Sequence, residues 1–89
     1  MSARRFVVRG IVQGVGFRWA TRAAATRLGV AGWVRNRADG TVEAWAEADD
    51  VRLDALEAWL HRGPPAARVS SVEAEPADPT GREGFEIRS

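Results

Sequence analysis

The spacing of apolar residues changes along this chain, and this change constrains the fold more than any other feature of the sequence. Residues 4–13 alternate, with Phe6, Val8 and Val12 on one side and Val7 and Ile11 on the other. Alternation of this kind is typical of a β-strand. After a short glycine-containing break, apolar residues recur at the spacing of an α-helix: Phe17, Ala20, Ala24 and Leu28. The chain is therefore predicted to begin with a strand followed by a helix.

The same change of spacing is repeated in the rest of the chain. Asp39-Gly40 is a hairpin turn signal between two strands. Asp49 or Asp50 can cap a second helix, which the Gly63-Pro64-Pro65 segment ends. The apolar stripe of this helix is Leu53, Leu56 and Leu60. The predicted strands after the first are residues 30–36, 41–48, 68–75 and 85–88.

This order of elements predicts an α+β fold. Each helix connects two strands and has a single apolar stripe, so both helices can cover one face of a mainly antiparallel sheet. The simplest arrangement is a ferredoxin-like βαββαβ sandwich with a short extra C-terminal strand. No internal repeat or long linker divides the sequence, so residues 1–89 are predicted to form a single domain.

The composition excludes several classes of protein. There is no cysteine among the 89 residues, which excludes a disulfide framework, a thiolate metal site and a cysteine nucleophile. Thirteen basic residues, all arginine, stand against twelve acidic ones, and a net charge of +1 attracts nucleic acid only weakly. No stretch approaches the roughly 20 apolar residues of a membrane span, and the first residues lack the apolar core of a signal peptide. We therefore expect a cytoplasmic protein that binds neither membrane nor nucleic acid.

Residues 13–18 form a possible anion-binding segment between the first strand and the first helix. Backbone N–H groups at a helix start have no partner within the helix, and that end carries roughly half a positive charge. Two glycines let the backbone fold closely around an anion, and an arginine adds donors that match phosphate geometry. The candidate residues, acting mainly through backbone amides, are Gly14, Val15, Gly16, Phe17 and Arg18. Taken alone, this segment is explained as simply by a tight turn with an exposed arginine.

Asn36 strengthens the interpretation as a binding site. In a ferredoxin-like sheet the first and second strands run parallel, so their C-terminal ends lie at the same edge. Asn36 ends the second strand and should therefore lie beside the glycine loop. Its amide can accept a hydrogen bond from a water and donate one to a phosphate oxygen. The alternative is a turn role, because asparagine is common at the ends of hairpins.

Together the two segments closely resemble the signatures of the acylphosphatase family. Residues 8–18 (VRGIVQGVGFR) match the first signature, and residues 32–36 (GWVRN), with Gly40 and Val42, match the second. The length and the order of elements also match over nearly the whole chain. One position departs, because the second signature ends on a glycine where this chain has Ala48. We expect a small backbone adjustment there.

The resemblance implies hydrolysis of acyl phosphates to a carboxylate and inorganic phosphate, by a monomer and without a metal or cofactor. It places the phosphate-binding arginine on Arg18 and the water-orienting asparagine on Asn36, which are the expected catalytic residues. This agrees with the chemistry, since phosphoryl transfer to water from a good leaving group depends mainly on positioning and charge stabilisation. The motifs describe only the phosphate end of the substrate, so the acyl group stays open.

Two other functions remain as alternatives. Ferredoxin-like domains also bind RNA or small regulators, but no strand carries a Gly-Phe-Gly-Phe type of aromatic pattern on its open face. The chain could also be a detached acylphosphatase-like module of a larger carbamoyl-phosphate-using maturation protein, which its ending shortly after Arg88 argues against. His61 and the aspartates near the second helix are expected to have helix-end and surface roles, and Trp59 is expected in the core.

Overall fold

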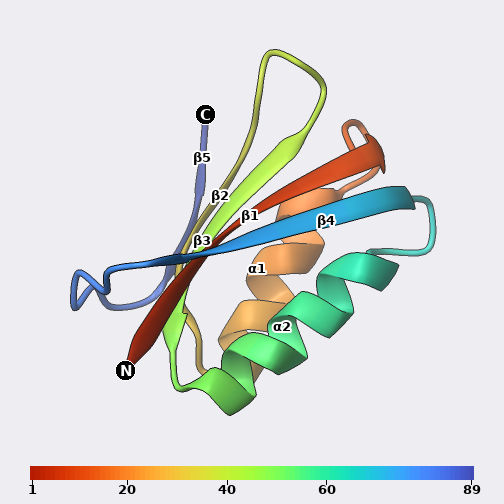
Figure 1. Cartoon of the computed structure of the whole chain (residues 1–89). Helices are drawn as coiled ribbons and strands as arrows, with labels where there is room; N and C mark the ends of the chain where they lie inside the picture. Colours follow the sequence, from red (N-terminus) through yellow and green to blue (C-terminus); the bar gives the residue numbers. More distant parts are fainter.

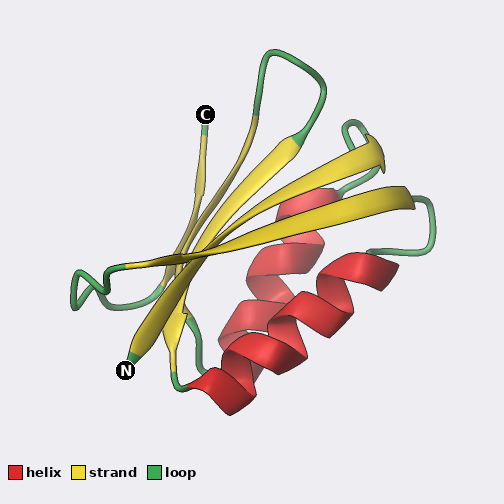
Figure 2. Cartoon of the chain, viewed as in Figure 1, coloured by secondary structure: helices red, strands yellow, loops and turns green.

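A computed structural model describes all residues of the chain, 1–89, and confirms the predicted α+β fold. Two helices lie on the same face of a five-stranded sheet (Figures 1 and 2). The elements in chain order are β1 (Ser2–Ile11), α1 (Phe17–Leu28), β2 (Ala31–Asn36), β3 (Val42–Ala48), α2 (Asp50–Arg62), β4 (Arg68–Ala77) and β5 (Phe85–Arg88). No helix is long and apolar enough to cross a membrane.

The strand order β4-β1-β3-β2-β5 explains how the sheet brings distant segments together. β3 is antiparallel to both β1 and β2, so β1 and β2 run in the same direction and end at the same edge. The short C-terminal strand pairs parallel with β2, from Gly32↔Phe85 to Arg35↔Arg88. A parallel neighbour needs a long connection, and here β3, α2 and β4 lie between the two strands in the sequence.

The core lies between the sheet and the helices. Phe6 and Val8 of β1 and the predicted leucines of α2 are completely buried. α2 lies against β4 and β1, and α1 against β2 and β5. The buried face of α1 differs from the predicted one, because Ala20 and Leu28 are only half-buried while Thr21 is fully buried. Burial of this hydroxyl is tolerated because Thr21 Oγ1 donates to the carbonyl of Phe17 at 2.8 Å.

Ala48, the position that departs from the family signature, lies within regular strand structure. It is the last residue of β3, is buried against the core, and pairs with Ser2 at the start of β1. No residue other than glycine has a positive φ. Ala48 therefore lies at the opposite end of the sheet from Asn36 and keeps ordinary β geometry.

The other face of the sheet carries charged residues that are nevertheless buried. Glu43 of β3 is 4% exposed and pairs with Arg5 on one neighbouring strand and Arg35 on the other. Burial raises the pKa of Glu43, but the hydrogen bonds from these two guanidinium groups outweigh it and hold the pKa below its ordinary value. Alternation alone predicts an exposed glutamate here. The arginine side chains of the adjacent strands cover it instead.

Glu47 anchors the connection between β4 and β5. Its carboxylate accepts hydrogen bonds from Trp45 Nε1, from the backbone N–H groups of Thr80 and Gly81, and from Thr80 Oγ1. Burial raises the pKa of Glu47, yet these hydrogen bonds outweigh it and lower the pKa to about 2. The ionised form is therefore the one that holds this loop in place.

We expect Glu47→Gln to lower the free energy of unfolding at pH 7 by about 3 kcal/mol, because a buried network loses its ionised acceptor. The carboxylate contributes fully above pH 4.5, its ordinary pKa, and the contribution falls as the pH drops toward 2. The difference in the free energy of unfolding between Glu47→Gln and wild type should therefore become steadily smaller as the pH falls from 4.5 toward 2. Urea unfolding from pH 7 to pH 3 measures it, with Glu83→Gln, an exposed residue of the same connection, as the control. A gap that is constant with pH would contradict this role.

Candidate active site

The loop between β1 and α1 is shaped by two glycines with positive φ. Gly14 and Gly16 have φ values of 74° and 75°, a region that other residues adopt only at a cost. A Cβ at either position would meet no atom within 4 Å, so the backbone conformation, and not lack of space, requires glycine here. Gly14 and Gly16 therefore turn the chain sharply into α1.

The start of α1 leaves its first N–H groups without capping side chains. Gly16 occupies the cap position and offers no side-chain hydrogen bond, and the first turn contains no acidic residue. The first helical hydrogen bond runs from the N–H of Ala20 to the carbonyl of Gly16 at 3.0 Å. The N–H groups of the preceding turn, at residues 17–19, thus have no carbonyl partner within the helix. Such a helix start suits an anion.

Arg18 has no carboxylate partner. Eight of the thirteen arginines form ion pairs with aspartate or glutamate. The five that do not are Arg18, Arg22, Arg27, Arg62 and Arg68. Arg18 is half-buried in the first turn of α1, directly after the glycine loop. Its guanidinium remains available for an anion bound at the helix start.

Asn36 ends β2 on the side of the sheet that faces the helices. Val34, two residues earlier, is completely buried on that side, and side chains alternate along a strand. Asn36 pairs with Val42, which is also part of the core between sheet and helices. Its Oδ1 atom is buried and accepts no hydrogen bond from the protein. A buried acceptor without a partner costs about 1–3 kcal/mol, so this oxygen is suited to receive a donor from a bound molecule.

Gln13 links the glycine loop to the hairpin that follows Asn36. Its Nε2 atom donates to the carbonyl of Arg37 at 2.8 Å and to the carbonyl of Thr41 at 3.0 Å. The structure thus joins the two segments that the sequence predicted to be neighbours. Arg18 and Asn36 make no hydrogen bond to each other, so each keeps its side chain for a third group. The role of Gln13 was missed from the sequence because its partners are backbone carbonyls, which leave no side-chain signal.

The aspartates near α2 and His61, which were expected from the sequence to have helix-end and surface roles, lie at or near α2 and not at the glycine loop. Asp49 caps α2, its side chain accepting from the N–H of Arg52 at 2.9 Å. Asp50 and Asp54 form ion pairs with Arg4. His61 lies exposed in the last turn of α2. No cluster of three or more histidine, cysteine, aspartate or glutamate side chains is placed to hold a metal.

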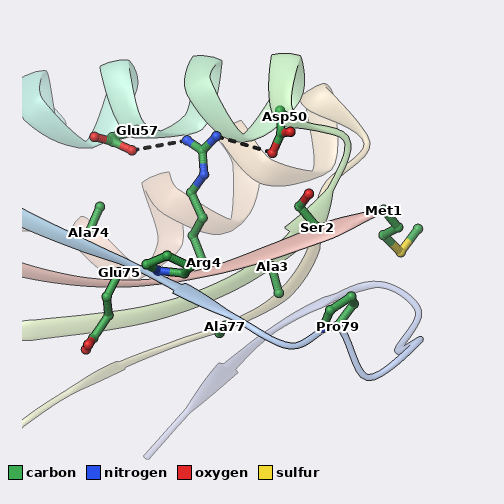
Figure 3. A pocket seen from close by; sticks show the side chains of 11 residues that line it. Met1, Ser2, Ala3, Arg4, Asp50, Glu57, Ala74, Glu75, Ala77 and Pro79 are labelled. Carbon is green, nitrogen blue, oxygen red and sulfur yellow. Dashed lines mark hydrogen bonds and ion pairs between the residues drawn. The ribbon is translucent and has the colours of Figure 1, made fainter.

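A hollow of about 460 Å³, whose lining residues are drawn in Figure 3, lies near the start of β1, whereas the glycine loop follows the end of β1. It is lined by the start of β1, the end of β4 and the first turns of α2. Its only arginine, the half-buried Arg4, already faces the carboxylates of Asp50 and Glu57 at 3.5 and 3.2 Å. The surplus of negative charge makes this hollow unsuited to a phosphate.

Comparison with known proteins agrees with the arrangement of the helices and the sheet. The family model described as Acylphosphatase matches residues 4–87. An acylphosphatase of Thermococcus kodakarensis is 55% identical over 80 residues, which is 90% of this chain and 88% of the relative. The crystal structure of acylphosphatase from Bacillus subtilis superposes with a TM-score of 0.97 at 34% identity and covers 100% of both chains.

A match to part of a larger protein also occurs. The crystal structure of HypF from T. kodakarensis gives a TM-score of 0.86 at 32% identity, covering 100% of this chain but only 12% of that one. The T. kodakarensis and B. subtilis acylphosphatases, in contrast, are matched along nearly their full length. The chain belongs to the acylphosphatase family.

Proposed function

We propose that Arg18 and the amides of residues 14–18 bind the phosphate of an acyl phosphate, while Asn36 orients the attacking water. The enzyme is an acylphosphatase, a hydrolase of the carboxyl–phosphate bond. In this reaction the water oxygen bonds to phosphorus and the bond from phosphorus to the carboxylate oxygen breaks. The products are a carboxylate, inorganic phosphate and a released proton.

The observation that carries the site assignment is the buried Asn36 Oδ1, which has no hydrogen bond from the protein. Asn36 is the last residue of β2, which runs in the same direction as β1. It therefore lies at the end of the sheet where the glycine loop follows β1 and leads into α1. A water that donates to this oxygen is held on the helix side of the sheet, toward the uncapped N–H groups. Arg18 and those amides stabilise negative charge on the phosphoryl oxygens. Because the carboxylate is a good leaving group, the reaction requires positioning more than a strong base.

We further propose that residues 1–89 act as one monomeric, cytoplasmic domain that binds neither membrane nor nucleic acid. On the open face of the sheet, Trp33 pairs with Trp45, but the guanidinium of Arg88 lies 4.7 Å from the centre of the Trp33 ring. Arginines of that face are engaged with glutamates, as Arg5 and Arg35 are with Glu43. This charge pairing leaves little attraction for a polyanion.

Phosphate release from benzoyl phosphate, measured beside binding of single-stranded RNA at physiological salt, tests the proposal. We expect release of inorganic phosphate at a rate unchanged by exhaustive treatment with EDTA, because charge stabilisation comes from Arg18 and backbone amides. RNA binding is expected to be undetectable at micromolar protein. Activity that disappears in EDTA and returns with magnesium would overturn the metal-free mechanism. Tight RNA binding without phosphate release would favour the binding-module alternative.

A further inference from the structure

Gln13 occupies an unusual place between the two segments of the site. It directly precedes Gly14 of the loop, and its two acceptors are the carbonyls of Arg37 and Thr41 in the hairpin after Asn36. Both acceptors are oxygens, so only the NH₂ group of the amide can face them. The side chain is half-buried, which limits competition from water.

The two carbonyls that Gln13 contacts are the ones that close the hairpin. The N–H of Arg37 donates to the carbonyl of Thr41 at 2.9 Å, and the N–H of Gly40 donates to the carbonyl of Arg37 at 3.2 Å. Gln13 therefore binds carbonyls that already take part in the backbone hydrogen bonds of the hairpin, next to Asn36. Its two bonds are the only hydrogen bonds between residues 12–18 and residues 36–42.

Each segment is otherwise secured without Gln13. β1 pairs with β3 and β4 along most of its length, and the hairpin is braced by Asp39, whose Oδ1 accepts from Thr41 N at 3.0 Å and Oγ1 at 2.6 Å. Loss of the Gln13 amide should therefore leave the fold intact. What it removes is the fixed position of the loop relative to Asn36.

We propose that Gln13 is a positioning residue for hydrolysis, which fixes the position of the phosphate-binding loop relative to Asn36. This inference rests on the site proposed above. A misplacement of reacting groups by about 1 Å can cost on the order of 100-fold in rate. Gln13 touches neither phosphate nor water in this scheme, and it acts on the rate only through the distance between the groups that do.

A double-mutant cycle with Asn36 tests this role. Gln13→Met keeps the length of the side chain and removes both hydrogen bonds, and it should lower kcat about 10-fold while inorganic phosphate binds within about 3-fold of wild type. In an Asn36→Ala background the same change should lower kcat by less than about 2-fold, because there is no longer an amide to place. Thermal melts should show a fall of no more than about 5 °C. Gln13→Asn, which is too short to reach both carbonyls, provides a polar second variant should Gln13→Met fold poorly.

The outcomes separate the two levels of the proposal. If Gln13→Met and Gln13→Asn keep kcat within about 2-fold of wild type, or if the loss is equally large in the Asn36→Ala background, the positioning role is wrong. If phosphate binding weakens in parallel with kcat, Gln13 acts on the loop alone and the link to Asn36 is wrong. If Asn36→Ala by itself is fully active, the proposed role of Asn36 fails, and the inference about Gln13 fails with it.

Discussion

Replacing Arg18 with alanine is expected to lower kcat/KM for benzoyl phosphate by at least about 1000-fold while leaving the fold intact. Loss of one preorganised donor to a developing charge typically costs on the order of 100–1000-fold. Loss of the Arg18 side chain should lower the rate by at least as much, because Arg18 is charged, has no carboxylate partner and lies at an uncapped helix start. Arg18→Lys should restore little, because an ammonium group cannot match the planar fork of donors.

Arg22→Ala is the matched control for this prediction. Arg22 lies on the same helix and also has no carboxylate partner, but its guanidinium lies 5.9 Å from the centre of the Trp19 ring. The Arg22→Ala variant should keep kcat/KM within a few-fold of wild type. It thereby separates a general effect of positive charge on α1 from a specific contact between Arg18 and the phosphate. Circular dichroism and thermal melts establish that both variants fold. An Arg18→Ala enzyme that keeps more than about a tenth of the activity would overturn the assignment.

Much of the fold is encoded in local patterns. The alternation in β1, the glycines before α1 and the cap at Asp49 each depend on neighbouring residues, so the order of elements was predicted correctly. The burial of Glu43 and Glu47 was not predicted, because alternation assigns them to the open face. Their partners come from other strands or from a loop 33 residues away in sequence, as for Glu47 and Thr80. Local spacing carries no information on such contacts.

The candidate site likewise contains residues that local sequence indicates and residues that only long-range contacts reveal. The glycine loop and Asn36 were predicted because residue type and position within a strand or turn are local properties, and the topology brings strand ends to one edge. The two hydrogen bonds that connect Gln13 to the hairpin were not predicted, because their acceptors lie 24 and 28 residues away in the sequence. The pairing of β5 with β2 was also left open, since nothing in four residues specifies a parallel edge position. Long-range contacts therefore account for what the sequence could not predict.

Asn36→Ala is expected to lower kcat about 100-fold and to leave the affinity for inorganic phosphate within a few-fold of wild type. The reason is that Arg18 and the amides contact phosphate in both the ground state and the transition state, whereas Asn36 acts on the water as bonds begin to form. A turn role for Asn36 predicts the reverse, a loss of stability of about 1 kcal/mol with nearly normal kcat. Kinetics, calorimetric titration with phosphate and thermal melts on the same preparations distinguish the two.

Asp39→Ala supplies the control that isolates the turn. Asp39 Oδ1 accepts hydrogen bonds from the N–H and the hydroxyl of Thr41, so its removal weakens the hairpin but leaves the Asn36 amide in place. We expect a lower melting temperature and a kcat within a few-fold of wild type. If Asp39→Ala lost as much kcat as Asn36→Ala, hairpin stability would explain both, and the buried Oδ1 of Asn36 would have no special part in the reaction. A destabilised but fully active Asn36→Ala enzyme would lead to the same conclusion, because the attacking water would then be held by some other group.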